Sequence, residues 1–465
     1  MDPDRPQNAR RTSLSSSTAK GGQYLPGARD GEDGANGASE RHRQPRDEQR
    51  AGSVRSGGGL NGGMAILLCA LLASGCSYIP WLNKEVDPRP PTELTKLTPA
   101  LSVNILWERE VGEGTDERRL SLVPAFQGGR LYVADAEGRV SAIDAASGRS
   151  LWERETGVPF SGGPEVVAGD LVLGSSDGDV VALAAADGRD RWRARVKSEV
   201  LSVPRIAGQT LVVHTLDDSV YAFDLATGQE RWKFDYKAPT LTLRGSSTPV
   251  IAGAGAIIGI SGGKLVNLEI ETGLPLWEVT VSAPRGRSEL ERIADIDADP
   301  VLVDKTIYAA TYNGDLAAVD LAGGSVLWRR TLSAHAGLAA DGGTLFVTDS
   351  DDVVWAADSA DGNGIWKQEG LKYRRVTAPA VIGNLVVVGD IGGQVHWLDR
   401  RDGRMLARVE VGDGPITATP LVHGGRVYVL GDDGTLAALS PGSAPPRSSP
   451  PPPAQPTPAE EEGER

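Results

Sequence analysis

The stretch Ala142-Ile-Asp-Ala-Ala-Ser-Gly-Arg-Ser-Leu-Trp152 contains the pattern that decides the fold: an Ala, a Gly six residues later, and a Trp four residues after that Gly. The full pattern returns at Ala182/Gly188/Trp192, Ala222/Gly228/Trp232, Ala318/Gly324/Trp328 and Ala356/Gly362/Trp366. One substitution is present at Asn267/Gly273/Trp277, and two are present at Trp397/Gly403/Ala407. A spacing of about 40 residues held through most of a chain is typical of repeat proteins, in which each unit buries its apolar face against its neighbours.

Each repeat predicts four short strands. A Pro-led apolar segment comes first, as at Pro124, and is followed after a Gly turn by a run such as Leu131-Tyr-Val-Ala134. The third segment, for example Gly138-Arg-Val-Ser-Ala-Ile-Asp144, alternates with period two, which indicates a half-buried strand. The fourth segment bears the Trp. Four-stranded units repeated at this period are blades of a β-propeller, so we expect an all-β protein.

The two ends of the array predict how the ring closes. The last repeat stops at Gly434-Thr-Leu-Ala-Ala-Leu-Ser440 without its Trp-bearing strand, whereas Asn104-Ile-Leu-Trp107 is a Trp-bearing strand with no blade before it. The N-terminal strand therefore supplies what the last blade lacks. We predict an eight-bladed propeller of four-stranded antiparallel blades over residues 103–440, closed by its N-terminal strand, because closure removes exposed sheet edges.

The flanking segments predict export and a lipid anchor. Residues 1–53 are polar and predict either a disordered leader or an artefact of the assigned start site, and residues 54–75 resemble a lipoprotein signal peptide. Leu72-Ala-Ser-Gly-Cys76 resembles a bacterial lipobox, which predicts lipidation of Cys76; the alternative is an ordinary secretory signal with an incidental Cys. We interpret residues 76–102 as a lipidated tether and residues 441–465 as a disordered, Pro-rich, acidic tail.

Composition and motifs argue against several function classes. The formal net charge is −14, and the chain after Cys76 has no basic run, which argues against nucleic acid as a partner. The five histidines lack the spacing of metal ligands. No nucleophile elbow, P-loop or dinucleotide fingerprint occurs in a fitting context. We therefore expect neither an enzyme nor a metal or cofactor site.

Two connections between neighbouring repeats are enlarged. The distance from the Trp of one repeat to the Pro of the next is 12 residues at Trp152 to Pro164, but 17 at Trp232 to Pro249 and 23 at Trp277 to Pro300. These connections lie on one face of a propeller, and binding residues tend to lie on loops of a rigid scaffold. The first loop contains Leu241, Leu243 and Arg244; the second contains Asp295 and Asp297. The alternative is that the leucines cap a blade core and Arg244 pairs internally with Asp295 or Asp297.

The Ala, Gly and Trp pattern resembles the tryptophan-docking motif of propellers that bind pyrroloquinoline quinone. That resemblance implies an alternative function, a quinoprotein dehydrogenase or a cofactor sensor. The motif itself has a structural explanation, since Gly permits the turn and Trp fills the space between blades. The adjacent Cys pair that accompanies the cofactor in those enzymes is missing from this sequence.

A second resemblance covers Leu72 to Ser440. Leu241-Thr-Leu-Arg-Gly245 and Ser288-Glu-Leu-Glu-Arg-Ile-Ala-Asp-Ile-Asp297 are similar to the two loop signatures of the BamB family, lipoproteins of the β-barrel assembly machinery in Gram-negative outer membranes. The resemblance implies a non-enzymatic scaffold, anchored on the periplasmic face of the outer membrane, that binds the POTRA domains of BamA and other subunits. Unfolded barrel proteins are a further implied partner. The implied partner-binding residues are Leu241, Leu243, Arg244, Asp295 and Asp297. A propeller that binds another envelope partner is the remaining alternative.

Overall fold

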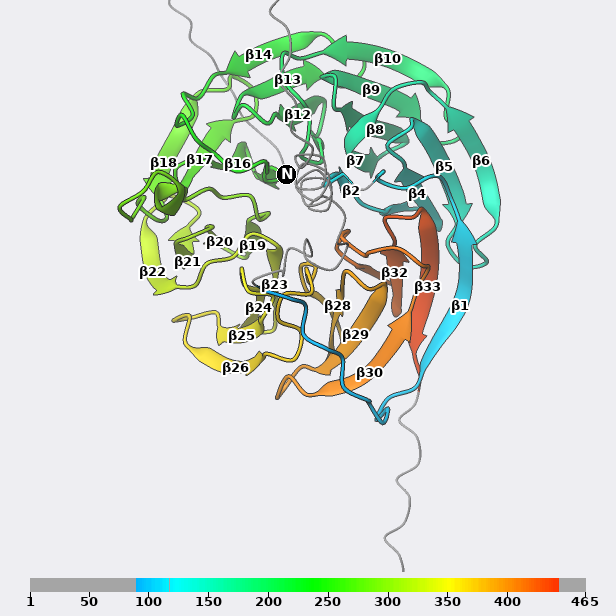
Figure 1. The fold of residues 1–465 in the computed structure, drawn as a ribbon. Helices are drawn as coiled ribbons and strands as arrows, with labels where there is room; N and C mark the ends of the chain where they lie inside the picture. The colour runs from blue at the N-terminus through cyan, green and yellow to red at the C-terminus, as the bar shows by residue number, and fades with distance from the viewer. Residues whose placement is uncertain (1–88, 117, 443–465) are drawn as a thin grey trace, which may run out of the picture. The chain divides into compact units, whose positions relative to one another are not determined.

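The computed structural model describes residues 89–116 and 118–442, and these form a ring of eight β-sheets (Figure 1). The prediction of an all-β, eight-bladed propeller is confirmed. Seven sheets have four strands, and, apart from two strands added from the N-terminal part of the chain, the strands of each sheet follow one another in sequence as an antiparallel meander. The predicted lipidation site Cys76, the predicted leader and signal segment, and residues 443–465 of the predicted tail lie outside the described residues.

The blades are numbered here in chain order. Blade 1 consists of β3 (Ala125–Gln127), β4 (Arg130–Ala134), β5 (Arg139–Asp144) and β6 (Ser150–Glu155), and blade 2 of β7 (Phe160–Val167), β8 (Asp170–Ser175), β9 (Asp179–Ala184) and β10 (Asp190–Arg195). Blade 3 consists of β11 (Arg205–Ala207), β12 (Thr210–His214), β13 (Val220–Asp224) and β14 (Glu230–Phe234), and blade 4 of β15 (Val250–Ala252), β16 (Gly255–Ile260), β17 (Lys264–Glu269) and β18 (Pro275–Thr280).

Blade 5 consists of β19 (Val301–Val303), β20 (Thr306–Ala310), β21 (Asp315–Asp320) and β22 (Val326–Thr331), and blade 6 of β23 (Gly337–Asp341), β24 (Thr344–Thr348), β25 (Val354–Asp358) and β26 (Gly364–Gln368). Blade 7 consists of β27 (Ala380–Ile382), β28 (Leu385–Gly389), β29 (Gln394–Asp399) and β30 (Met405–Glu410), and blade 8 of β31 (Leu421–His423), β32 (Arg426–Leu430), β33 (Thr435–Pro441) and β1 (Val103–Glu110). One 3₁₀ helix, η1, spans Leu290–Arg292.

The ring closes through β1, as the sequence predicts. β1 pairs antiparallel with β33, and Trp107 lies opposite Ala438. In Figure 1 the blue β1 lies beside the red β33, so the two ends of the repeat array share one sheet. A feature that the sequence did not predict is β2 (Ser121–Leu122), which pairs in parallel with β7 and adds a fifth strand to blade 2. The chain from β1 to β3 thus also ties blade 8 to blade 2.

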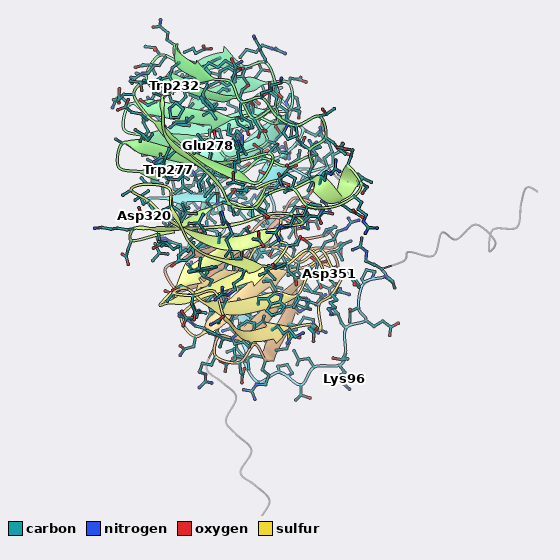
Figure 2. The ribbon with its side chains drawn as sticks, turned by 90° about the vertical axis from the view of Figure 1, so that its left-hand side faces the viewer. Lys96, Trp232, Trp277, Glu278, Asp320 and Asp351 are labelled. Atoms are coloured by element: carbon teal, nitrogen blue, oxygen red, sulfur yellow. The ribbon has the colours of Figure 1, made fainter. Side chains whose placement is uncertain are left out.

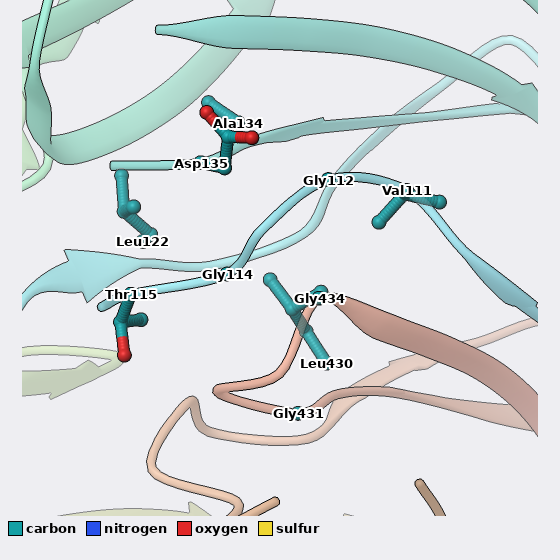
Figure 3. Close-up of a pocket in the computed structure, with 10 residues that line it drawn as sticks. All are labelled: Val111, Gly112, Gly114, Thr115, Leu122, Ala134, Asp135, Leu430, Gly431 and Gly434. Carbon is teal, nitrogen blue, oxygen red and sulfur yellow. The ribbon is translucent and has the colours of Figure 1, made fainter. Parts of the chain in front are cut away.

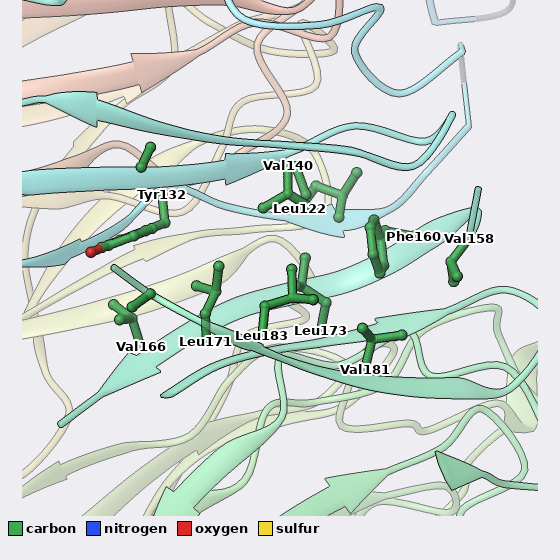
Figure 4. Packing of buried hydrophobic residues seen from close by; sticks show 13 residues of the cluster. Leu122, Tyr132, Val140, Val158, Phe160, Val166, Leu171, Leu173, Val181 and Leu183 are labelled. Atoms are coloured by element: carbon green, nitrogen blue, oxygen red, sulfur yellow. The ribbon is translucent and has the colours of Figure 1, made fainter. Parts of the chain in front are cut away.

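The hydrophobic core is divided into layers between blades. One layer contains Tyr132, Val140, Phe160, Leu173 and Val181, all nearly fully buried and drawn from blades 1 and 2 (Figure 4). The docking tryptophans close the outer edge of such layers, and each indole N–H donates to a backbone carbonyl of the next blade, as from Trp152 to Ala185 at 3.1 Å. Each blade therefore depends on its neighbour for both burial and hydrogen bonding.

A small cavity lies where the ring closes. Figure 3 shows its lining, which comes from β2, β4 and β32, the segment just after β1 and the adjoining turns and includes Val111, Thr115, Leu122 and Leu430. Its volume of about 10 Å³ is enough for roughly one water molecule. The Thr115 hydroxyl is buried and has no hydrogen-bond partner among the described residues. This cavity is too small to hold a quinone cofactor.

Candidate functional site

The two enlarged loops lie on the same face of the ring. One occupies residues 235–249 between β14 and β15, and the other occupies residues 281–300 between β18 and β19. The corresponding connection between β6 and β7 takes only residues 156–159. Each of these connections leads from the outer strand of one blade to the inner strand of the next, so they share a face with the turns between second and third strands. Asp351, in such a turn of blade 6, marks this face in Figure 2.

Asp295 joins the two loops. Its side chain is buried, and its carboxylate accepts a hydrogen bond of 2.7 Å from the backbone N–H of Leu243 and one of 3.0 Å from the N–H of Gly262. Burial raises the pKa of Asp295, while these two hydrogen bonds act in the opposite direction. Asp295 is therefore a positioning residue that fixes the backbone of the first loop.

Asp297 packs against the first loop at Gly245, two residues after Leu243. A Cβ atom added to Gly245 would lie 2.3 Å from Cγ of Asp297, so the loop approaches this closely only because residue 245 is glycine. Burial, together with the charges of Asp295 and Asp218, raises the pKa of Asp297 to about 7. Three carboxyl groups are thus held close together beneath the loop, and their mutual repulsion favours the protonated form of one of them.

Arg244 pairs with neither of the aspartates. Its Nη2 donates to Oε1 of Glu199 at 2.7 Å, and its Nη1 donates to the backbone carbonyl of Arg119 at 2.5 Å. The Arg244 side chain is 45% exposed and that of Glu199 is 13% exposed. The alternative in which Arg244 pairs with Asp295 or Asp297 is therefore wrong. Glu199 and Arg119 instead aim the guanidinium along the surface and leave part of it accessible.

The two leucines differ in exposure. Leu241 is 42% exposed, which contradicts the alternative that it caps the core of its blade. Leu243 is half-buried, and its backbone is held by Asp295. Arginine is among the residues that dominate protein interfaces, and here a partly exposed guanidinium lies on the same fixed loop as an exposed aliphatic side chain. The structure thus brings Leu241, Leu243 and Arg244 together above Asp295 and Asp297.

His214 and Asp218 support the end of the same loop from below. Nδ1 of the buried His214 lies 2.9 Å from the carbonyl oxygen of Ser247 and 3.0 Å from Oγ of Ser246, and its Nε2 lies 3.5 Å from Asp218. Sequence reasoning missed these supports, and also Glu199 and Arg119, because all four are distant from the loop in sequence: His214 lies 32 positions from Ser246, and Arg119 lies 125 positions from Arg244. Only the short turn of blade 3 that contains Asp218 gave a signal, and Asp in such turns recurs in most repeats.

Within residues 89–116 and 118–442, no three or more His, Cys, Asp or Glu side chains are arranged to hold a metal ion. In the same part of the chain, no helix has the length and apolar character needed to cross a membrane.

Comparison with known proteins decides the family. The family model described as outer membrane protein assembly factor BamB matches residues 100–192, 136–368 and 372–444. The chain belongs to the BamB family. A BamB of Pseudomonas aeruginosa is 48% identical over 374 residues, covering 80% of this chain and 97% of that protein. A BamB of Alkalilimnicola ehrlichii is 51% identical over 347 residues, covering 75% of this chain and 91% of that protein.

Solved structures agree with this family and show how widely the fold is used. The crystal structure of BamB from Moraxella catarrhalis matches with a TM-score of 0.67 and 26% identity, covering 73% of this chain and all of that one. A quinohemoprotein alcohol dehydrogenase from Comamonas testosteroni matches with a TM-score of 0.60 at 14% identity, covering 72% of this chain and 76% of the other. The second similarity shows the shared propeller fold alone, whereas the BamB relatives are assembly factors.

Proposed function

We propose that this BamB-family chain is a non-enzymatic scaffold that binds the periplasmic POTRA domains of BamA and so assists the folding and insertion of β-barrel proteins. The observation that carries the proposal is the bond between the two enlarged loops, in which buried Asp295 holds the backbone of Leu243. That bond fixes a loop which exposes Leu241 and Arg244. A surface fixed before binding loses little conformational entropy when a partner docks.

The five predicted partner-binding residues divide into two roles in this proposal. Leu241 and Arg244 are the exposed groups that touch the partner, with Leu243 beside them. Asp295 is buried, so it acts by positioning Leu243 rather than by direct contact. Asp297 packs under Gly245 and completes the support. Removal of either aspartate is thus expected to weaken binding through the shape of the loop.

The cellular context belongs to the same proposal. The relatives are named outer membrane protein assembly factors. We infer that this chain is anchored by acyl groups on Cys76 to the periplasmic face of the outer membrane and works with the other subunits of the assembly machinery. In this proposal, unfolded barrel proteins are a further partner of the scaffold. Residue 76 lies outside the described residues, so intact-mass analysis of the mature chain is the test of its lipidation.

The interface is tested by a binding titration. The full chain and the variant Leu241→Ala/Arg244→Ala are compared for affinity toward the purified POTRA domains of BamA from the same organism. Truncation of two central interface residues costs roughly 2 kcal/mol or more each, so we expect affinity to fall by at least a hundredfold. The thermal unfolding midpoint is expected to stay within about 2 °C.

A matched control comes from the opposite face of the ring. Arg191 is 44% exposed and pairs with Asp170 at 3.0 Å, much as Arg244 pairs with Glu199, and Leu274 is 63% exposed. The variant Leu274→Ala/Arg191→Ala therefore removes similar groups and should bind like the native chain. Equal loss in both variants would reject the loop as the interface, and absence of binding by the native chain would reject the partner.

A further inference from the structure

The outer strand of each blade has a β-bulge immediately before its docking position. In blade 5 the register between β21 and β22 shifts between Ala318 and Val319, so that Leu327 is the additional residue. The same shift occurs in blades 4 and 6, where the additional residues are Leu276 and Ile365. It occurs again in blade 7 at Leu406. These equivalent positions lie near the turns between the third and fourth strands, on the face opposite the enlarged loops.

In blade 7 this position is covered by the chain itself. Two consecutive backbone N–H groups, those of Ala100 and Leu101, donate to the carbonyl oxygen of Leu406 at 2.8 and 3.3 Å. The Leu101 side chain packs into the cluster that contains Leu406 and Trp397. We call residues 92–102, which run along the outside of blade 7 before β1, the strap. The strap shows which ligand suits a bulge of this kind: an extended segment with two free N–H groups and an aliphatic side chain.

Blades 4, 5 and 6 present the same position without such a cover. Leu276, Leu327 and Ile365 are 51%, 56% and 54% exposed, whereas Leu406 under the strap is 9% exposed. In blades 2 and 3 the position holds Arg191 and Arg231 instead, and each forms an ion pair with an aspartate of its own blade. The equivalent residues of blades 8 and 1 are Leu106, which is 43% exposed, and Leu151, which is half-buried. The exposed bulges of blades 4, 5 and 6 are consecutive around the ring on β18, β22 and β26, the covered bulge of blade 7 separates them from Leu106, and we call these three the rim (Figure 1). Figure 2 shows the outer side of these blades. Trp277, the residue after Leu276, lies toward the left of that view, and Asp351 on the loop face lies toward the right.

We propose that the rim binds an extended aliphatic polypeptide segment of another protein in the manner in which blade 7 binds its own strap. Each bulge carbonyl receives backbone N–H groups, and the exposed aliphatic side chain of the bulge packs against an aliphatic side chain of the segment. This site lies on the face opposite the enlarged loops and does not depend on their partner. Neighbouring sheets pack about 10 Å apart and an extended chain advances about 3.3 Å per residue, so a segment that spans three bulges needs at least about six residues.

The chemistry of the surrounding turns favours a polypeptide over a membrane surface. Residues 270–274, 321–325 and 359–363, the turns that precede the three bulges, contain no Lys or Arg. Adsorption to anionic lipid headgroups relies on such cations. Backbone N–H groups on an extended chain are the complementary donors for uncharged carbonyl groups beside aliphatic side chains.

The strap sequence provides the probe. A fluorescein-labelled peptide with the sequence of residues 92–103 is titrated with the full chain, and binding is followed by fluorescence anisotropy. We expect saturable binding that weakens at least tenfold in the variant Leu276→Asp/Leu327→Asp/Ile365→Asp. The control is Leu290→Asp, which changes a leucine that is 68% exposed on the other face and should leave binding unchanged. Circular dichroism confirms that the variants are folded.

A second probe tests the backbone contacts without changing the protein. The same peptide with N-methyl groups on the residues that correspond to Ala100 and Leu101 cannot donate these two hydrogen bonds, and we expect it to bind at least tenfold more weakly. Equal binding of the methylated peptide overturns the proposal. Binding of the peptide to the triple variant with unchanged affinity also overturns the proposal, because the peptide would then bind elsewhere, for example at blade 7 in place of the chain's own strap. The proposal is also overturned if the peptide does not bind and the rim is needed instead for self-association of the chain or for its adsorption to phospholipid vesicles.

Discussion

Trp397 lies directly opposite Ala407 across β29 and β30, which reverses the order found in the other blades. There the small residue stands on the third strand and the Trp on the fourth, in the pairs Ala142–Trp152, Ala182–Trp192, Ala222–Trp232, Asn267–Trp277, Ala318–Trp328, Ala356–Trp366 and Ala438–Trp107. Leu101 of the strap packs beside the inverted pair. A fourth-strand Trp normally docks on the turn of the next blade, but blade 8 has no such turn, because β33 ends at Pro441 and its outer strand comes from the other end of the chain.

Exchange of this pair should therefore not be neutral. Trp397→Ala removes a fully buried side chain and is expected to cost about 3–5 kcal/mol in the free energy of unfolding. The exchange variant Trp397→Ala/Ala407→Trp restores the usual order but gives the new indole no turn to dock on, so we expect it to recover less than half of that loss. Urea denaturation measures all three proteins. Recovery to within about 1 kcal/mol of the native value would show that the strap and ring closure do not matter here.

Trp397→Phe is the control for this series. The indole Nε1 of Trp397 is buried and has no hydrogen-bond partner among the described residues. Phe removes that unsatisfied donor, whose burial costs about 1–3 kcal/mol, while it also gives up some packing. The two effects oppose each other, and we expect a change of less than about 1.5 kcal/mol. A cost as large as that of Trp397→Ala would point to a hydrogen bond from this indole.

The role of Asp295 predicts a difference between two substitutions. Asp295→Ala leaves the N–H groups of Leu243 and Gly262 without their acceptor and should destabilise the loop by roughly 1–3 kcal/mol. Asp295→Asn keeps one carbonyl oxygen as an acceptor and should therefore destabilise the loop less than Asp295→Ala does. Amide hydrogen exchange at Leu243 is the direct measurement, because its protection depends on this bond. Unchanged exchange in Asp295→Ala would remove the basis for calling Asp295 a positioning residue.

Asp297 predicts how stability depends on pH. Its folded-state pKa of about 7 is above its ordinary value of 3.8, so between these values the folded state keeps a proton that the unfolded state has lost. The free energy of unfolding should therefore decrease as the pH rises from about 4 to 7 and then level off, with an upper limit of about 4 kcal/mol from this group. Asp297→Asn should flatten that part of the curve, as measured by urea titrations from pH 4 to 8.5. Parallel curves for both proteins would mean that Asp297 titrates normally.

The strap depends on a buried charged network in blade 7. Arg374 donates to Oδ2 of Asp390 at 2.6 Å and to the carbonyl oxygen of Thr92 at 3.0 Å, and His396 lies 2.8 Å from the same carboxylate. Burial alone would raise the pKa of Asp390, but the hydrogen bonds from His396 and Arg374 outweigh it and lower the pKa to about 2. Asp390 is thus expected to stay ionised and stabilise the fold until the pH falls below about 4.

Removal of Asp390 should release the strap as well as destabilise the blade. Asp390→Ala leaves Arg374 without its buried partner and is expected to cost about 3–5 kcal/mol. Limited proteolysis within residues 92–102 should become at least tenfold faster than in the native chain. Asp361→Ala, on an exposed turn of blade 6, is the control. If cleavage becomes faster in both variants, or in neither, the position of the strap does not depend on this network.

The fold could be predicted because its signals are local and repeated. Gly148 adopts a positive φ of 71°, and an added Cβ would lie 2.6 Å from Cδ2 of Trp107, so each motif Gly marks a packing contact with the Trp of the preceding blade. The strand without a blade at Trp107 and the blade without an outer strand at Ser440 likewise required the ring to close. For the same reason the enlarged loops could be assigned to one face, since strands in a meander alternate direction.

What the sequence by itself determined was the blade, the number of blades, the closing strand and the loops that carry the candidate site. Only the tertiary structure decided the partners of individual side chains. Arg244 contacts residues 125 and 45 positions away, and Leu101 covers Leu406 from the far end of the chain. Such contacts leave no periodic signal, because ring closure brings those segments together in space and the sequence around each one records only its own strand.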